Sequence, residues 1–295
     1  LTTSPAPPTR RIEHLRPVSV ARLVSGNQVV DLGQNINGWI CLTDLGPAGT
    51  TTRLEHGEML ALDGEVHLAH LATSDYFTKE VLSPGQVDEV TSGGTDDAFE
   101  PRHTTHGFQY VSIQGRDDDL MVDDLTGVVV HTDLTRTGWF ASSDERRDRL
   151  HEAAGGSVRD TAGEIPTDGP QRERVGWTGD WQLFCPTAAF LYDVAGFSAK
   201  WLRDLRSGQW ADGRVPNYVP DPYGPVSHDE GPAGFLTGSA GWGDATTIVP
   251  WEMWAEYGDE LVPSENYTAM VAWVDFAARR AHEGRHASRV ARRPD

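Results

Sequence analysis

Residues 128–161 read VVVHTDLTRTGWFASSDERRDRLHEAAGGSVRDT and join two different sequence patterns. The run from Val128 to Asp133 is rich in β-branched residues, which predicts a strand. Ser142 is followed three residues later by Glu145, a capping-box pattern that indicates the start of a helix, which we expect to run to about Thr161. This stretch therefore predicts a β part before it and a helical part after it.

The residues before this junction, from Val18 to about Arg136, form short runs of Val, Thr, Ile and aromatic residues. Turn pairs such as Pro84-Gly85 separate these runs. The runs predict strands at Gln28–Leu32, Gly38–Leu42, Thr51–His56, Asp75–Leu82, Phe108–Ile113 and Val128–Asp133. So many short strands without a long helical period favour a β-sandwich of two sheets.

The residues after the junction show helical periodicity. They predict further helices at Trp181–Tyr192, Phe197–Gln209, Asp244–Tyr257 and Asn266–His282, which we expect to pack as hairpins. Two of the connecting loops, Ile165–Gly179 and Arg214–Gly243, are long and carry Gly, Pro, Asp and Trp. Long structured loops are usually functional, so we expect a site on this part of the chain.

Composition excludes several function classes. The 295 residues include 25 Lys+Arg and 44 Asp+Glu, and a formal net charge of −19 repels phosphate backbones and anionic lipid. We therefore expect no nucleic-acid partner, and no apolar run reaches the ~20 residues of a membrane helix. The two cysteines, Cys41 and Cys185, are far apart and are expected to be free thiols. The chain starts at Leu1 without a recognisable signal peptide, and its sequence does not distinguish a cytoplasmic from a secreted protein.

The chemistry is concentrated in residues 165–180, IPTDGPQRERVGWTGD, where Pro and Gly shape a loop with three carboxylates, two Arg and one Trp. Sugar hydrolysis needs this mixture, because one carboxyl group protonates the leaving oxygen. Other carboxylates and Arg bind hydroxyl groups, and Trp covers the apolar face of the ring. The alternative is a structural network of ion pairs. A shorter version of the loop's end recurs as Gly241-Trp242-Gly243-Asp244, which indicates either two similar helix entries or a shared role.

The run DGPQRERVGWTGD, residues 168–180, resembles the active-site signature of the bacterial α-L-rhamnosidases, glycoside hydrolase family 78. The resemblance covers nearly the whole chain, since further motifs of that family are matched at residues 31–39, 55–58, 101–110, 200–205, 209–216 and 241–251. It implies a β-sandwich followed by helical hairpins of an (α/α)6 barrel. It also implies an enzyme that removes terminal non-reducing α-L-rhamnose from glycosides or polysaccharides by an inverting mechanism, with no cofactor.

Carried over to the matching positions, the resemblance implies that Glu173 is the general acid. It further implies that the rhamnose pocket is lined by Asp168, Arg172, Trp177, Asp180 and Trp242. Two positions depart from the family pattern: Gly169 replaces a common Cys, and Gln109 replaces a common Arg of the β domain.

The expected domains are a linker at 1–17, a β-sandwich at 18–137 and a truncated barrel at 138–295. Five expected helices are less than half of a barrel of six hairpins, so the resemblance implies an interior piece of a longer enzyme. The general base of an inverting glycosidase would then lie beyond Asp295, and the chain by itself would be inactive.

Other candidates receive simpler interpretations. His103 and His106 lack an acidic or Cys partner at metal-site spacing, so we expect no metal site there. His56, His67 and His70 are expected at the surface or at the edge of the core. Two other functions stay open, a non-catalytic carbohydrate-binding module and a different (α/α)6 enzyme such as a glucuronyl hydrolase or a lyase. The sequence indicates neither the linkage preference nor the oligomeric state.

Overall fold

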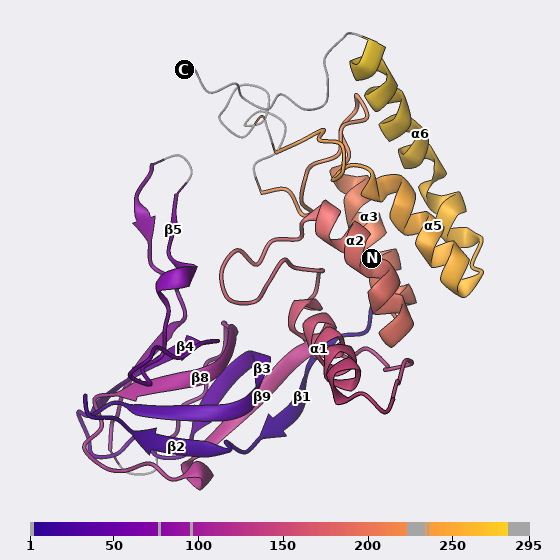
Figure 1. Cartoon of the computed structure of the whole chain (residues 1–295). Coiled ribbons are helices and arrows are strands. Elements are labelled where there is room, and N and C mark those ends of the chain that lie inside the picture. The colour runs from indigo at the N-terminus through magenta and orange to yellow at the C-terminus, as the bar shows by residue number, and fades with distance from the viewer. Residues whose placement is uncertain (1–2, 76–77, 95–96, 223–233, 235, 283–295) are drawn as a thin grey trace.

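A computed structural model describes residues 3–75, 78–94, 97–222, 234 and 236–282. The chain forms a curled β sheet and, beside it, a group of helices that begins with α1, Glu145–Thr161 (Figure 1). The predicted order, a β domain followed by helical hairpins, is confirmed. The last part of the predicted barrel segment, residues 283–295, lies outside the described residues.

The sheet has seven antiparallel strands in the order β1-β9-β3-β8-β4-β7, with β2 paired to β3. The strands are β1 Thr9–Leu15, β2 Ser19–Arg22, β3 Gln28–Leu42, β4 Thr51–Gly57, β7 Val87–Thr91, β8 His106–Gln114 and β9 Leu125–Thr132. A separate two-stranded ribbon is formed by β5, Thr73–Ser74, and β6, Val81–Leu82. Single turns of 3-10 helix occur at Ala69–Leu71 and Val122–Asp124.

The long strand β3 explains why one curled sheet replaces the two separate sheets of the sequence-based expectation. The strands predicted at 28–32 and 38–42 are one continuous strand, whose register with β8 shifts between Asp31 and Ile36. Gly33 lies inside this shift with φ of 76°, a left-handed conformation that favours glycine. Because of the shift, β3 pairs with β2 near its start and with β9 near its end, and the sheet curls around a core that includes Ile40 and Phe108.

Residues 1–17, which are expected to form a linker, contain a strand. Residues Thr9–Leu15 form β1 at the edge of the sheet, paired with β9. Nearly all of its side chains are exposed, so the strand lacks the half-buried alternation that sequence reasoning relies on. Its backbone pairing with β9 and the packing of Leu15 against the core hold it on the sheet.

The five helices within the described residues start or end within about five residues of their expected positions. They are α1, α2 Thr178–Leu191, α3 Ala195–Gly208, α5 Ala245–Tyr257 and α6 Leu261–His282. The start of α1 differs in its cap, since the Asp144 carboxylate accepts from the N–H of Arg146 and replaces the expected Ser142. No described helix combines the length and the apolar character needed to cross a membrane.

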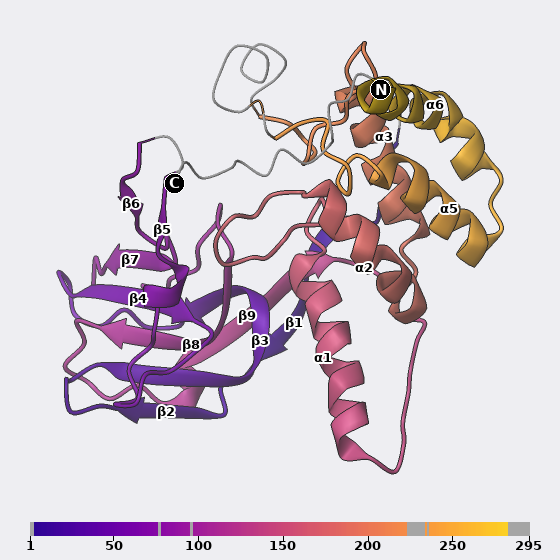
Figure 2. The same cartoon turned by 45° about the horizontal axis from the view of Figure 1, so that its top comes forward.

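The helices pack as neighbours around a common core, with α5 in contact with α2, α3 and α6. Helix α1 lies against the sheet, and the Asn37 N–H donates to its Asp160 carboxylate at 3.1 Å. At the end of α1, the Thr132 N–H of β9 donates to the Ala162 carbonyl at 2.8 Å. The loop from α1 to α2 therefore starts at the sheet, and Figure 2 shows it extending over the side of β8 before α2 begins.

Candidate active site

The loop between α1 and α2 is closed by Asp168 and Val175. The Asp168 N–H donates to the Val175 carbonyl at 3.1 Å, and the Val175 N–H donates to the Asp168 carboxylate at 2.8 Å. This pair of bonds fixes the ends of the segment that carries Arg172 and Glu173. A rigid loop of this kind holds charged side chains at a defined position without helix or strand geometry.

The carboxylate of Glu173 is held by two donors. Arg172 Nη2 donates to Oε1 at 3.1 Å, and Trp177 Nε1 donates to Oε2 at 3.0 Å. The Glu173 side chain keeps 39% of its surface exposed, so a ligand can reach the carboxylate. Its position is thus set by the two neighbours that the sequence motif contains.

Asp168 and Asp180 lie in the same electrostatic environment as Glu173. Burial raises the pKa of Asp168, and the negative charges of Glu173 and Asp180 raise it further. Burial also raises the pKa of Asp180, and again the Glu173 charge adds to the effect. The charge of Glu173 therefore raises the pKa of both aspartates, which places the three carboxylates of the loop in one electrostatic environment.

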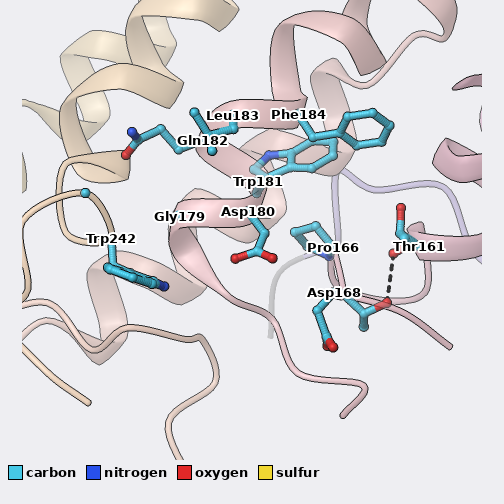
Figure 3. Close-up of a pocket in the computed structure, with 12 residues that line it drawn as sticks. Thr161, Pro166, Asp168, Gly179, Asp180, Trp181, Gln182, Leu183, Phe184 and Trp242 are labelled. Carbon is cyan, nitrogen blue, oxygen red and sulfur yellow. Dashed lines mark hydrogen bonds between the residues drawn. The ribbon is translucent and has the colours of Figure 1, made fainter. Parts of the chain in front are cut away.

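A cavity of about 560 Å³ opens beside these carboxylates. Its lining is mostly apolar and includes few polar side chains. The lining residues are Thr161, Pro166, Thr167, Asp168, Gly179, Asp180, Trp181, Gln182, Leu183, Phe184, Gly241 and Trp242. Figure 3 shows the Asp180 carboxylate between Trp242 on one side and Pro166 on the other, with Asp168 below it. Its volume lies in the range of small-molecule sites, and its composition suits a ligand with apolar faces and a few hydroxyl groups.

The second loop reaches this cavity through Trp242. Gly179, in the first turn of α2, lies close to this second loop. A Cβ atom on Gly179 would be 3.1 Å from the Gly241 carbonyl oxygen and 3.3 Å from the Trp242 ring. The Trp242 and Trp177 rings are 6.5 Å apart, and Trp177 also packs edge-on against Tyr218 at 5.0 Å. The two Gly-Trp segments thus meet and form an aromatic wall.

The six residues predicted from the sequence gather in one region, in two groups. Asp168, Asp180 and Trp242 line the cavity. Arg172, Glu173 and Trp177 stand beside it, linked to one another by hydrogen bonds and to Trp242 by the ring contact of Trp177.

A group of metal-ligand type lies in the β domain and consists of His56, Asp88 and His106, whose ligand atoms are all within 4.8 Å of one another. The two imidazole rings stack at 4.0 Å with an interplanar angle of 12°. Ring-nitrogen lone pairs lie in the ring plane, so lone pairs in two nearly parallel planes do not converge on one ion. His56 is fully buried, which corrects its expected place at the surface or core edge.

Sequence reasoning missed the contribution of the β domain to this region. Arg174 Nη2 donates to the Gln86 side-chain oxygen at 3.2 Å, and a Cβ atom on Gly107 would lie 2.6 Å from Pro170 Cγ. Both contacts join residues more than sixty positions apart. The spacing pattern of a loop motif carries no signal for such contacts.

Comparison with known proteins gives matches over both parts of the chain. Residues 135–293 match the model of the bacterial α-L-rhamnosidase six-hairpin glycosidase domain. Residues 21–131 match the model of the bacterial α-L-rhamnosidase concanavalin-like domain. The boundary between these matches falls at the change from strands to helices.

Individual relatives agree with the domain matches. An α-L-rhamnosidase of Streptomyces avermitilis is 36% identical over 274 residues, which are 91% of this chain and 24% of the relative. The crystal structure of the Streptomyces avermitilis α-L-rhamnosidase complexed with L-rhamnose superposes with a TM-score of 0.84 at 34% identity, over 95% of this chain and 26% of that one. The crystal structure of the native α-L-rhamnosidase from Aspergillus terreus gives a TM-score of 0.80 at 37% identity, over 92% of this chain and 30% of that one.

The chain spans about a quarter of the length of the curated relatives that it matches. Within that span, the match to the glycosidase domain covers more than half of the residues, and the β domain and the helices take the arrangement of the solved relatives. The chain therefore belongs to the bacterial α-L-rhamnosidase family, in which it matches the six-hairpin glycosidase domain and the concanavalin-like domain before it.

Proposed function

We propose that the protein is an α-L-rhamnosidase that hydrolyses terminal non-reducing α-L-rhamnose from glycosides or polysaccharides. The observation that carries this proposal is the meeting of Asp168, Glu173 and Asp180 with Trp177 and Trp242, on two loops of a domain that matches the family. A terminal rhamnosyl residue is a 6-deoxy sugar unit with a methyl group and three free hydroxyl groups. An apolar cavity with a few carboxylates is complementary to that combination.

In this proposal Glu173 is the general acid that protonates the glycosidic oxygen. Its carboxylate is accessible, and the N–H groups of Arg172 and Trp177 fix it in place. Asp168 and Asp180 line the cavity and accept hydrogen bonds from sugar hydroxyls, Arg172 binds a hydroxyl oxygen, and Trp177 and Trp242 cover the ring. The inverting mechanism further requires a carboxylate base that activates water on the opposite face of the sugar.

We also propose a division into a β domain and a glycosidase domain near residue 137, with β1 as part of the β domain. The family matches at 21–131 and 135–293 support this division, as does the change from strands to helices.

The test is hydrolysis of p-nitrophenyl α-L-rhamnoside by the intact protein, beside the α-L-arabinoside, β-D-glucoside and β-D-glucuronide. We expect turnover of the rhamnoside alone, with β-L-rhamnose as the first anomer seen by ¹H NMR. Turnover of the glucuronide in its place would indicate a different (α/α)6 enzyme. Binding of L-rhamnose without turnover of any glycoside would indicate a binding module, and α-L-rhamnose as first product would exclude inversion.

A further inference from the structure

The segment that carries Glu173 rests on the β domain at both of its ends. At its start, Gly107 of β8 lies so close to it that a Cβ atom would be 2.6 Å from Pro170 Cγ and 3.0 Å from the Gln171 backbone nitrogen. At its end, Arg174 Nη2 donates to the side-chain oxygen of Gln86 at 3.2 Å. These contacts flank Glu173 on either side in the sequence.

Arg174 adopts a backbone conformation that needs support. Its φ is 57°, in the left-handed region that side chains with a Cβ atom disfavour by about 1 kcal/mol. This residue directly follows Glu173, so its backbone conformation sets how the chain leaves the proposed acid. The hydrogen bond to Gln86 is the contact that joins this strained residue to the sheet.

Gln86 connects both ends of the segment. It is fully buried just before β7, and its Nε2 donates to the Gly107 carbonyl at 2.7 Å while its Oε1 accepts from Arg174. A carbonyl only accepts and a guanidinium only donates, so these two partners fix the orientation of the amide. The side chain of Gln86 thus holds the strand under Pro170 and the arginine after Glu173 at the same time.

The histidine beside Gln86 strengthens this arrangement. His106 Nδ1 faces Gln86 Oε1 at 3.3 Å, and its Nε2 faces the Asp88 carboxylate at 3.0 Å. Both partner atoms are side-chain oxygens, so each ring nitrogen of His106 faces an acceptor. The stacked His56 ring stays neutral, because burial and the charge of His106 lower its pKa to about 3. Gln86 is thus joined through His106 to Asp88 of β7 as well as to the loop.

We propose that Gln86 is a positioning residue for the proposed acid, acting on Glu173 through Arg174 and through the Gly107 backbone. This inference rests on the proposed function, since it takes Glu173 as the acid. General-acid catalysis needs the carboxyl group within hydrogen-bonding reach of the leaving oxygen, and a displacement of about 1 Å costs on the order of 10²-fold in rate. The β domain therefore contributes to turnover without touching the sugar.

The test compares Gln86→Met with Gln28→Met in the intact protein. Gln28 is a matched control, because it is 1% exposed in β3 and its side-chain bonds run to Asp118 and Leu120 and not to the catalytic loop. The rate is measured on an alkyl rhamnoside, which needs acid assistance, and on p-nitrophenyl α-L-rhamnoside, which needs little. We expect Gln86→Met to lower kcat about 10-fold on the alkyl substrate and at most about 2-fold on the aryl substrate, with KM unchanged.

A purely structural role would give a different result. In that case Gln86→Met, like Gln28→Met, would lower both rates equally in proportion to the folded fraction, and the proposal would be wrong. Arg174→Met gives a second variant from the loop side, and Arg174→Lys retains a donor, so we expect Lys to restore part of the loss on the alkyl substrate. No difference between Met and Lys at position 174 would contradict the proposed path through Arg174.

Hydrogen exchange separates this inference from the proposed function. The amides of residues 171–176 should exchange faster in Gln86→Met than in the unaltered protein and in Gln28→Met. A protein without rhamnosidase activity would overturn the proposed function, whereas unchanged exchange in Gln86→Met would overturn the anchoring alone.

Discussion

Two loops of the helical domain share a pattern and use it differently. The first, Gly176 to Asp180, leads into α2, and the second, Gly241 to Asp244, leads into α5. Asp180 lies in the first turn of α2 and lines the cavity. Asp244 directly precedes α5, where its carboxylate accepts from the Gly241 N–H at 2.8 Å and from Trp273 Nε1 at 3.0 Å.

The two segments differ in where the helix begins. Asp180 follows Trp177 by three positions and lies inside α2, whereas Asp244 follows Trp242 by two positions and lies just outside α5. Gly243 then packs so tightly on α6 that a Cβ atom there would lie 2.3 Å from the Trp273 ring. The first loop thus exposes its carboxylate to the cavity, and the second uses its carboxylate to hold the fold.

The largest difference between the two loops is expected in catalysis, from a substitution of Glu173. This residue has no counterpart in the second loop. Glu173→Gln should lower kcat by ~10²–10⁴-fold on alkyl rhamnosides, because general-acid assistance is worth about that much, and by less on p-nitrophenyl α-L-rhamnoside. Steady-state kinetics on both substrates measure the effect. An equal loss on both would argue against an acid at this position.

The next largest effect is a loss of folding stability, expected from a substitution of Asp244 in the second loop. Asp244→Asn should lower the free energy of unfolding by about 1–3 kcal/mol, because the amide nitrogen now faces one of two N–H donors and leaves it without an acceptor. Trp273 is 2% exposed, so water does not replace the lost bond. Urea denaturation of both variants measures this, and a loss of stability in Asp180→Asn as large as in Asp244→Asn would remove the distinction between the loops.

Local sequence patterns are enough to predict the helices and the residues of the first loop. Periodicity over ten or more residues locates α2 and α3 within about three residues of their observed ends, because each helix buries one face. The loop residues can be identified from the sequence because Pro, Gly, Trp and charged groups together are unusual on a solvated helix face. The motif and its resemblance then assigned them to one site, and the structure brings them together.

Contacts between residues far apart in the sequence cannot be predicted in the same way. The union of two predicted strands into β3 depends on a register shift against β8, and β1 pairs with β9 although nearly all of its side chains are exposed. The Gln86 contact with Arg174 spans 88 positions. The roles of Asp180 and Asp244 depend on where a helix begins to within one residue, which is finer than helix boundaries are determined by sequence patterns.

A smaller effect is expected from the aromatic residue that the second loop contributes. Trp242→Ala should weaken L-rhamnose binding by about 0.5–1.5 kcal/mol, or roughly 2- to 10-fold, because the sugar loses one apolar wall while the carboxylates remain. We expect KM to rise and kcat to change little. Trp251→Ala is the matched control, since Trp251 is 58% exposed on α5 and is not part of the cavity lining. Equal affinities in the two variants would mean that Trp242 does not contact the sugar.

The smallest expected effect concerns folding stability, to which the carboxylates of Asp180 and Asp244 should contribute in opposite directions. Burial raises the pKa of Asp180 in the folded protein above its ordinary value of 3.8, and the charge of Glu173 raises it further. Between the unfolded and the folded pKa the native state binds more protons than the unfolded state, so stability falls as the pH rises through this window. Above the window the full cost of the ionised carboxylate is present, whereas it vanishes only well below pH 3.8, where both states are protonated. Asp180→Asn should therefore be more stable than the unaltered protein at pH 7.5, by about 0.5 kcal/mol because the group is partly exposed and screened, and this difference should be smaller at pH 4. Thermal unfolding at the two pH values measures this difference, and a variant that is less stable at pH 7.5 than at pH 4, relative to the unaltered protein, would show that the Asp180 carboxylate stabilises the fold as that of Asp244 does.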